Sequence, residues 1–120
     1  RLDDGVLIKD NHIAVAGSVA KAIRLAQKAG LKCIEVECDT LEQVAEALDN
    51  GADRILLDNM SNKSLSEAVK LSAGRTPLEA SGGVSLKTVR AVAETGIDFI
   101  SVGSITQSAR AVDIGLDLLS

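Results

Sequence analysis

Five short runs of β-branched and other apolar residues recur along the chain, and their regular spacing constrains the fold more than any other feature of the sequence. The runs begin at residues 5, 33, 54, 77 and 99, so their starts lie 28, 21, 23 and 22 residues apart. The segments between them repeat apolar residues every three or four positions, as the buried face of an α-helix does. A strand followed by a helix, five times over, predicts a parallel sheet with right-handed crossovers. The five runs are 5–10, 33–38, 54–59, 77–81 and 99–103.

Polar residues and glycines mark the ends of the predicted helices. Residues that cap helix N-termini stand before the four apolar stripes, and glycines follow those stripes. The caps are Ser18, Thr40 with Gln43 as a capping box, Ser61 or Ser64, and Ser85, and the glycines are Gly30, Gly51, Gly74 and Gly96. A last short helix is predicted over Val112–Leu119.

The predicted fold class is α/β, with residues 1–120 as a single domain of five consecutive β-α units. The chain has one aromatic residue, Phe99, so its core must consist of aliphatic side chains, as in parallel sheets covered by helices. Two arrangements of the sheet satisfy this pattern. The units can form part of a (β/α) barrel or an open, flavodoxin-like sheet.

Composition excludes several classes of function. The net charge is −4 and no basic cluster occurs, which argues against nucleic-acid binding. No apolar run approaches the roughly 20 residues that a membrane span requires. The two cysteines, Cys33 and Cys38, are too few for a disulfide scaffold and are interpreted as core thiols of a cytoplasmic protein.

Charged side chains collect where the predicted strands end, which is where parallel α/β folds place their sites. Glu35 and Glu37 share one strand face, and Asp58 ends the next strand, so the three predict an acidic cluster opposite Lys9. Such a cluster fits Mg²⁺ held by carboxylates and substrate phosphates, or else a structural network of ion pairs. His12, the sole histidine, is either an acid or base or a hydrogen-bonded residue of a surface loop.

Two loops that contain glycine follow the fourth and fifth predicted strands. Ser81-Gly82-Gly83 precedes the helix predicted to start near Ser85, and Gly103-Ser104 leaves the next strand in the same way. Backbone amides in such loops, close to a helix N-terminus, form anion sites that glycine lets a phosphate approach. The alternative is that these glycines are only turn residues.

Taken in order, five motifs resemble the C-terminal part of the quinolinate phosphoribosyltransferases. They are Leu7-Ile8-Lys9-Asp10-Asn11-His12, Glu35-Val36-Glu37, Leu56-Leu57-Asp58-Asn59, Glu79-Ala80-Ser81-Gly82-Gly83 and Val102-Gly103-Ser104-Ile105-Thr106. The segment 111–117 resembles the family's C-terminal signature. The resemblance implies a glycosyltransferase of NAD biosynthesis that converts quinolinate and 5-phosphoribosyl-1-pyrophosphate to nicotinate mononucleotide, pyrophosphate and CO₂ with Mg²⁺. It also implies an incomplete β/α barrel and a dimer with shared sites.

The resemblance implies a role for each matching residue. Lys9 would contact the anionic substrates, and Glu37 and Asp58 would hold ribose hydroxyls or Mg²⁺ and stabilise charge at the ribose C1. The residues Ser81, Gly82, Gly83, Gly103 and Ser104 would hold the 5′-phosphate. Gln107 stands where the family often has histidine, so it and His12 are further substrate-binding candidates.

The chain is thus expected to be a fragment of a barrel catalytic domain, inactive by itself. Two alternatives are a stand-alone flavodoxin-like domain that binds phosphate or is structural, and a thiamine-phosphate synthase-like barrel piece.

Self-association is the last expectation from the sequence. A partial barrel exposes sheet edges, and its inner face is expected to carry apolar residues that need covering. These are Leu7, Ile34, Val36, Leu57 and Ile100. A homodimer or larger homo-oligomer follows from this interpretation.

Overall fold

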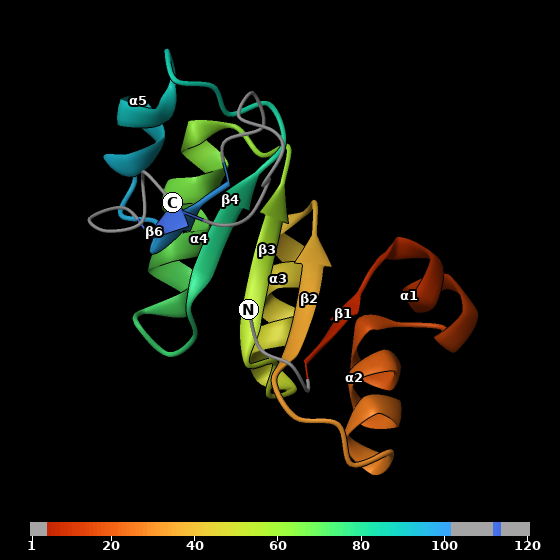
Figure 1. Ribbon diagram of the computed structural model, residues 1–120. Coiled ribbons are helices and arrows are strands. Elements are labelled where there is room, and N and C mark those ends of the chain that lie inside the picture. Colours follow the sequence, from red (N-terminus) through yellow and green to blue (C-terminus); the bar gives the residue numbers. More distant parts are fainter. Residues whose placement is uncertain (1–4, 102–111, 114–120) are drawn as a thin grey trace.

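In the computed structural model, which describes residues 5–101 and 112–113, one sheet packs against a layer of helices (Figure 1). The five predicted strands and the four predicted intervening helices are all present. The elements are β1 (Val6–Ile8), α1 (Asp10–Ala16), α2 (Val19–Lys28), β2 (Ile34–Cys38), α3 (Leu41–Asp49), β3 (Arg54–Asp58), α4 (Asn62–Ser72), β4 (Leu78–Ser81), α5 (Val89–Ala93), β5 (Phe99–Ile100) and β6 (Val112–Asp113). None of the helices described is long and apolar enough to cross a membrane.

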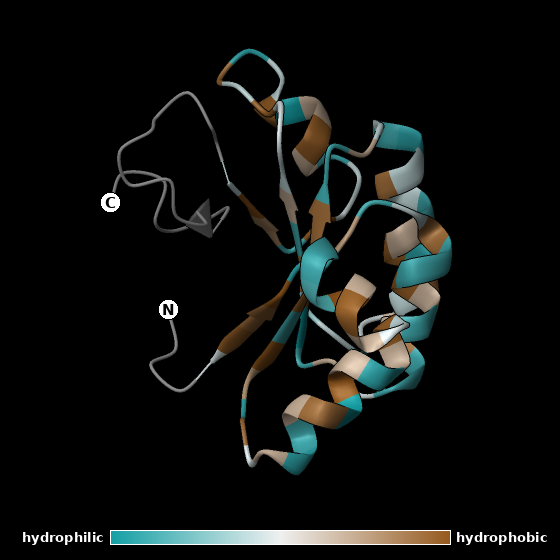
Figure 2. Cartoon of the chain, turned by 90° about the vertical axis from the view of Figure 1, so that its right-hand side faces the viewer, coloured by the Kyte–Doolittle hydropathy of each residue, from teal (hydrophilic) through white to brown (hydrophobic). Residues whose placement is uncertain are grey.

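Strand order and helix placement decide between a partial (β/α) barrel and an open, flavodoxin-like sheet. The strands lie in the order β1-β2-β3-β4-β5-β6, and the first five are parallel. The helices lie along the same side of the sheet (Figure 2). A doubly wound sheet reverses its strand order and carries helices on both faces. The sequential order is that of an arc of a (β/α) barrel, and the flavodoxin-like alternative is wrong.

The predicted caps describe most of the helix ends correctly. Ser18, Thr40 and Ser61 each accept a hydrogen bond from the backbone N–H three residues later, at 3.1 Å. The capping box differs in detail, because Gln43 accepts from the N–H of Asp39 rather than from that of Thr40. The four predicted terminal glycines all have a positive φ, from 79° to 92°, the conformation that ends a helix.

Two elements differ from the prediction. The helix α1 was not predicted, because it buries none of its residues and therefore shows no apolar stripe. Val112–Asp113 forms a strand where a helix was predicted, and it pairs antiparallel with β5. This pairing satisfies backbone groups that β5 would otherwise leave open at its edge. The remainder of the predicted helix, 114–119, lies outside the described residues.

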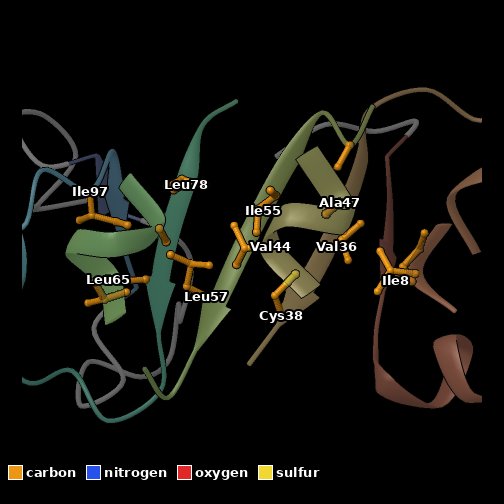
Figure 3. Packing of buried hydrophobic residues seen from close by; sticks show 14 of the residues in the cluster. Ile8, Val36, Cys38, Val44, Ala47, Ile55, Leu57, Leu65, Leu78 and Ile97 are labelled. Carbon is orange, nitrogen blue, oxygen red and sulfur yellow. The ribbon is translucent and has the colours of Figure 1, made fainter. Parts of the chain in front are cut away.

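The core lies between the sheet and the helices. Alternate residues of β2 and β3, among them Val36, Ile55 and Leu57, are fully buried against α3 and α4 (Figure 3). Burying an aliphatic side chain of this size contributes about 1.5–3 kcal/mol. Cys38 belongs to this core as predicted, and burial raises the pKa of its thiol to about 12. Cys33 does not, since it is only half-buried and precedes β2 with φ at 57°.

The opposite face of the sheet is charged, which corrects the expected apolar inner face. Ile34, Val36, Leu57 and Ile100 all belong to the core on the helix side. The residues next to them along each strand lie on the opposite, concave face, which is turned away from the helices. Leu7, in register with Glu35, is the one residue of the expected apolar set that belongs there. The concave residues of β2, β3 and β4 are Glu35, Glu37, Arg54, Leu56, Asp58, Glu79 and Ser81.

At the amino-terminal edge of the sheet, the same pair of aspartate hydrogen bonds occurs twice. Asp53 donates its N–H to the Ile34 carbonyl at 2.8 Å and accepts from the Ile34 N–H through Oδ2 at 2.7 Å. Asp98 forms the same pair of bonds with Leu78, at 3.2 and 2.8 Å. Each aspartate stands directly before a strand and fixes its register on the previous strand. The carboxyl edge is thereby held in place, and the candidate site lies there.

Candidate active site

Three strands bring the predicted acids and the glycine loop together at the carboxyl edge of the sheet. Asp58 ends β3 in register with Ser81, which ends β4. The Ser81 hydroxyl donates to Asp58 Oδ1 at 3.5 Å, and the N–H of Asn59 donates to the Ser81 carbonyl at 3.0 Å. On the other side of β3, Glu37 lies near enough to Asp58 for the two charges to interact. The polar residues expected to collect at this edge thus include Glu37, Asp58 and Ser81, which lie close together.

Glu37 shows how the charges at this edge compete. Partial burial raises the pKa of its carboxyl above the ordinary value, and the neighbouring Asp58 carboxylate raises it further. The Lys9 ammonium acts in the opposite direction and favours the charged form. Lys9 itself is exposed at the end of β1, so its charge is available to an anion from solvent. The site thus combines two crowded carboxylates with one cation across the cluster.

Glu35 does not belong to this cluster, although the sequence analysis grouped it with Glu37. Arg54, next to it on β3, lies with Nε 3.4 Å from Glu35 Oε2 and with Nη2 3.3 Å from Glu79 Oε1. The same guanidinium stacks on the ring of Phe99, 4.1 Å from its centroid. Glu35 and Glu79 are therefore held in an ion-pair network across four strands. For Glu35 the structural alternative, a network of ion pairs, is therefore observed.

Arg54 was missed by the sequence analysis, although a signal for it was present. It alternates with Leu56 and Asp58 along β3 and so shares their face of the strand. A basic residue on the same face as four acids is the expected partner for some of them.

The glycine loop is shaped by close approach to Asp58 and Asn59. Gly82 and Gly83 have φ of 79° and 75°, which other residues adopt at a cost. A Cβ on Gly82 would lie 2.6 Å from Asn59 Oδ1 and 2.8 Å from Asp58 Oδ1. No side chain fits there while both groups keep their positions. Gly82 is therefore required by this close approach as well as by its φ.

A pocket of about 250 Å³ lies on the helix side of this loop. Its floor is apolar, with Leu57, Leu65 and Val92, and Ser61, Gly82 and Gly83 contribute to its polar rim. The loop thus separates the acidic cluster from a hollow between β4 and the helices.

The helix predicted to start near Ser85 begins later. Residues 85–88 form a turn in which the Ser85 N–H donates to Thr88 Oγ1 at 3.0 Å, and α5 starts at Val89. The Ser85 carbonyl accepts from the N–H groups of Thr88 and Val89, at 3.1 and 2.9 Å, so this turn leads directly into α5. The predicted start near Ser85 therefore marks this turn, and α5 itself begins one turn later.

His12 lies in a helix rather than in a loop. It occupies the first turn of α1, and its Nδ1 accepts a hydrogen bond from the Lys9 N–H at 3.0 Å. The neutral ring therefore carries its proton on Nε2, on an exposed side chain one turn from Lys9. The remaining candidates, Gly103, Ser104 and Gln107, lie outside the described residues.

The donor set of the acidic cluster suits a hard divalent cation. Carboxylate oxygens are the ligands that Mg²⁺ prefers, and Mg²⁺ commonly takes one or two of them together with substrate phosphates and water. Within residues 5–101, no three His, Cys, Asp or Glu side chains come together as a metal site. Glu37 and Asp58 are thus the residues of this cluster that would hold an ion shared with a ligand, and the described residues form no site that would enclose one.

A parallel sheet in sequential order, with helices on one side and polar residues at its carboxyl edge, defines a domain of the (β/α)-barrel class. The particular family follows from comparison of the whole chain. Residues 1–117 match the family model described as quinolinate phosphoribosyl transferase, C-terminal domain, and the chain belongs to that family.

Relatives and solved structures agree with this assignment. The chain is 46% identical over 122 residues to a nicotinate-nucleotide pyrophosphorylase [carboxylating] of Mycobacterium leprae, covering 98% of this chain and 43% of that protein. It also resembles the solved nicotinate-nucleotide pyrophosphorylase of Francisella tularensis, with a TM-score of 0.83 and 42% identity over 94% of this chain and 41% of that one. The chain therefore spans about two fifths of the length of these relatives.

A more distant likeness concerns the fold alone. The thiamine phosphate pyrophosphorylase of Pyrococcus furiosus has a TM-score of 0.64 to this chain, at 23% identity over 81% of it. The thiamine-phosphate synthase-like alternative thus shares the barrel architecture, whereas the family match assigns the chain elsewhere.

Proposed function

We propose that this chain forms the phosphoribosyl-binding part of the active site of a carboxylating nicotinate-nucleotide pyrophosphorylase. In the proposed reaction, quinolinate displaces pyrophosphate from the ribose C1 of 5-phosphoribosyl-1-pyrophosphate, and loss of CO₂ leaves nicotinate mononucleotide. The observation that carries the proposal is the meeting of Glu37, Asp58 and the Ser81–Gly83 loop at one edge of a family member. Residues 1–120 would act as a single domain within the barrel, inactive without the rest of it.

The acidic pair suits the chemistry at the ribose. As the bond from C1 to pyrophosphate breaks, positive charge develops on the sugar ring, and preplaced negative charge stabilises it. Burial and the neighbouring Asp58 carboxylate raise the pKa of Glu37, and a cation formed beside it would favour its charged form. Glu37 and Asp58 are thus the proposed catalytic residues, and their oxygens would also accept hydrogen bonds from ribose hydroxyls.

The anionic ends of the substrates require donors and positive charge. Backbone N–H groups of Ser81, Gly82 and Gly83 would hold the 5′-phosphate, which glycine lets approach closely. The exposed Lys9 would contact an anionic group of the substrates. Gly103 and Ser104 are proposed to complete the phosphate site, and His12 and Gln107 to contact substrate.

Glu37 and Asp58 are also the residues proposed to hold Mg²⁺, since two carboxylates leave positions for ligand oxygens. When bound, the ion neutralises charge on the pyrophosphate group. The protein's own contribution is to place the two carboxylates on neighbouring strands at a fixed spacing.

Titration with 5-phosphoribosyl-1-pyrophosphate, followed by amide NMR, tests this proposal. The Gly82 and Gly83 signals should shift first, with millimolar affinity, which corresponds to about 4 kcal/mol, and binding should tighten when MgCl₂ is added. The Glu37→Gln, Asp58→Asn double variant should lose this increase, and it should bind no more tightly than the wild-type chain does without Mg²⁺. Shifts centred on the amino-terminal edge of the sheet, near Asp53 and Asp98, would contradict the proposal.

We also propose that the chain works in the cytoplasm as part of a homo-oligomer. Its two cysteines are free, as in a reducing compartment. In the described sheet one edge of β1 has no neighbouring strand, and such edges recruit partners. The concave face offers charged rather than apolar groups, so an interface over it would pair charges.

A further inference from the structure

Asn59, the residue directly after β3, has a backbone conformation that few residue types adopt. Its φ is 54°, in the left-handed region, where asparagine is among the most tolerated side chains after glycine. Its N–H donates to the Ser81 carbonyl at 3.0 Å and so extends the pairing of β3 with β4 past Asp58. This turn fixes the chain where the acidic cluster meets the glycine loop.

The side chain of Asn59 lies against that loop. The space that a Cβ on Gly82 would occupy is 2.6 Å from Asn59 Oδ1 and 2.9 Å from its Cγ. The same space is 2.8 Å from Asp58 Oδ1, so the amide and the carboxylate both lie against Gly82. The absence of a side chain at residue 82 thus makes room for this amide group.

The amide has hydrogen-bonding capacity that the described chain does not use. A carboxamide offers two N–H donors and one acceptor, and within residues 5–101 the Asn59 side chain forms no hydrogen bond. The residue is exposed at the carboxyl edge, and its amide lies near both Gly82 and the space that Asp58 Oδ1 approaches. A neutral donor there can bind an anionic oxygen without cancelling the charge of Asp58.

We propose that Asn59 is a direct ligand-binding residue of this site, and that its side-chain N–H donates to a phosphate oxygen of the bound phosphoribosyl group. This inference rests on the proposed function and deepens it, because it names a contact between the acidic cluster and the phosphate loop. The chemical class recognised is a sugar phosphate, with hydroxyls at Asp58 and the phosphate at Asn59 and the loop.

The competing explanation is that Asn59 serves only its backbone turn. Glycine adopts the left-handed conformation freely, so Asn59→Gly keeps the turn and removes the amide. Asn59→Asp keeps the size and tolerates the turn, and it replaces the donor by a negative charge. The two variants therefore separate the contact from the turn, and Asn50→Asp adds the same charge at the opposite edge of the sheet.

Amide NMR titration with ribose 5-phosphate and with inorganic phosphate measures the contact. We expect Asn59→Gly to raise the dissociation constant about five- to tenfold, Asn59→Asp to raise it further, and Asn50→Asp to leave it within about twofold. Unchanged affinity in Asn59→Gly or Asn59→Asp would overturn the assignment of Asn59 and leave the phosphate loop intact. Absence of any response in the wild-type chain would overturn the proposed phosphate site as well, so the two failures are distinguishable.

Discussion

Replacing Gly82 by alanine tests the packing at the centre of the site, and a matched control exists in the same chain. Gly82 and Gly30 are both exposed and both have φ of 79°. A Cβ on Gly30 would meet nothing within 4 Å, whereas one on Gly82 would lie 2.6 and 2.8 Å from Asn59 Oδ1 and Asp58 Oδ1. The two substitutions share the backbone strain and differ only in the collision.

The expected magnitudes follow from these two terms. An alanine at positive φ costs about 1–2 kcal/mol, which is the whole expected effect of Gly30→Ala. Forcing a methyl group into occupied space adds about 1–3 kcal/mol, so Gly82→Ala should destabilise the chain by roughly 2–5 kcal/mol. Displacement of the Asp58 carboxylate should also abolish the response to 5-phosphoribosyl-1-pyrophosphate, which Gly30→Ala leaves unchanged.

Urea unfolding monitored by circular dichroism measures both free energies of unfolding. Combining Gly82→Ala with Asn59→Gly removes the nearest colliding group, so the double variant should recover about 1 kcal/mol relative to additivity. If Gly82→Ala and Gly30→Ala cost the same within error, the amide and carboxylate do not occupy the space beside Gly82.

Three further predictions concern charge, register and assembly. Glu37→Gln should stabilise the chain at neutral pH and have no effect below about pH 4, as measured by urea unfolding. The reason is that the pKa of Glu37 is raised in the folded chain, so ionisation of this carboxyl lowers the free energy of unfolding as the pH rises above its ordinary pKa of 4.5. A stability gain that is largest in acid would contradict this sign. Asp53→Ala should cost about 1–3 kcal/mol by leaving the buried Ile34 N–H without its carboxylate partner, while Asp49→Ala, at an exposed helical position, should change stability by less than about 0.5 kcal/mol. Light scattering at tens of micromolar should give a mass above that of one 12.4 kDa chain, and a monodisperse species of that mass would refute self-association.

Local patterns in the sequence were sufficient to predict most of the fold. Strand alternation, helical stripes, caps and terminal glycines all act over a few residues, so β2, α3 and the positive φ of Gly51 could be read directly. The position of the site at the carboxyl edge followed as well, because parallel strands share one edge. Polar residues of several strands, among them Glu35, Glu37, Asp58 and Ser81, were predicted to collect there for this reason.

The tertiary structure alone decided which face of the sheet each residue occupies and which acids are neutralised. Period-two alternation predicts that Glu35 and Glu37 share a face, but only the register of β2, β3 and β4 brings Arg54 to Glu35 and Glu79 and leaves Glu37 beside Asp58. The expected apolar inner face failed for the same reason, since strand order and one-sided helices direct the aliphatic residues outward. The ion-pair partner of each acid and the sheet face of each side chain depend on contacts between residues far apart in the chain, and no local pattern contains that information.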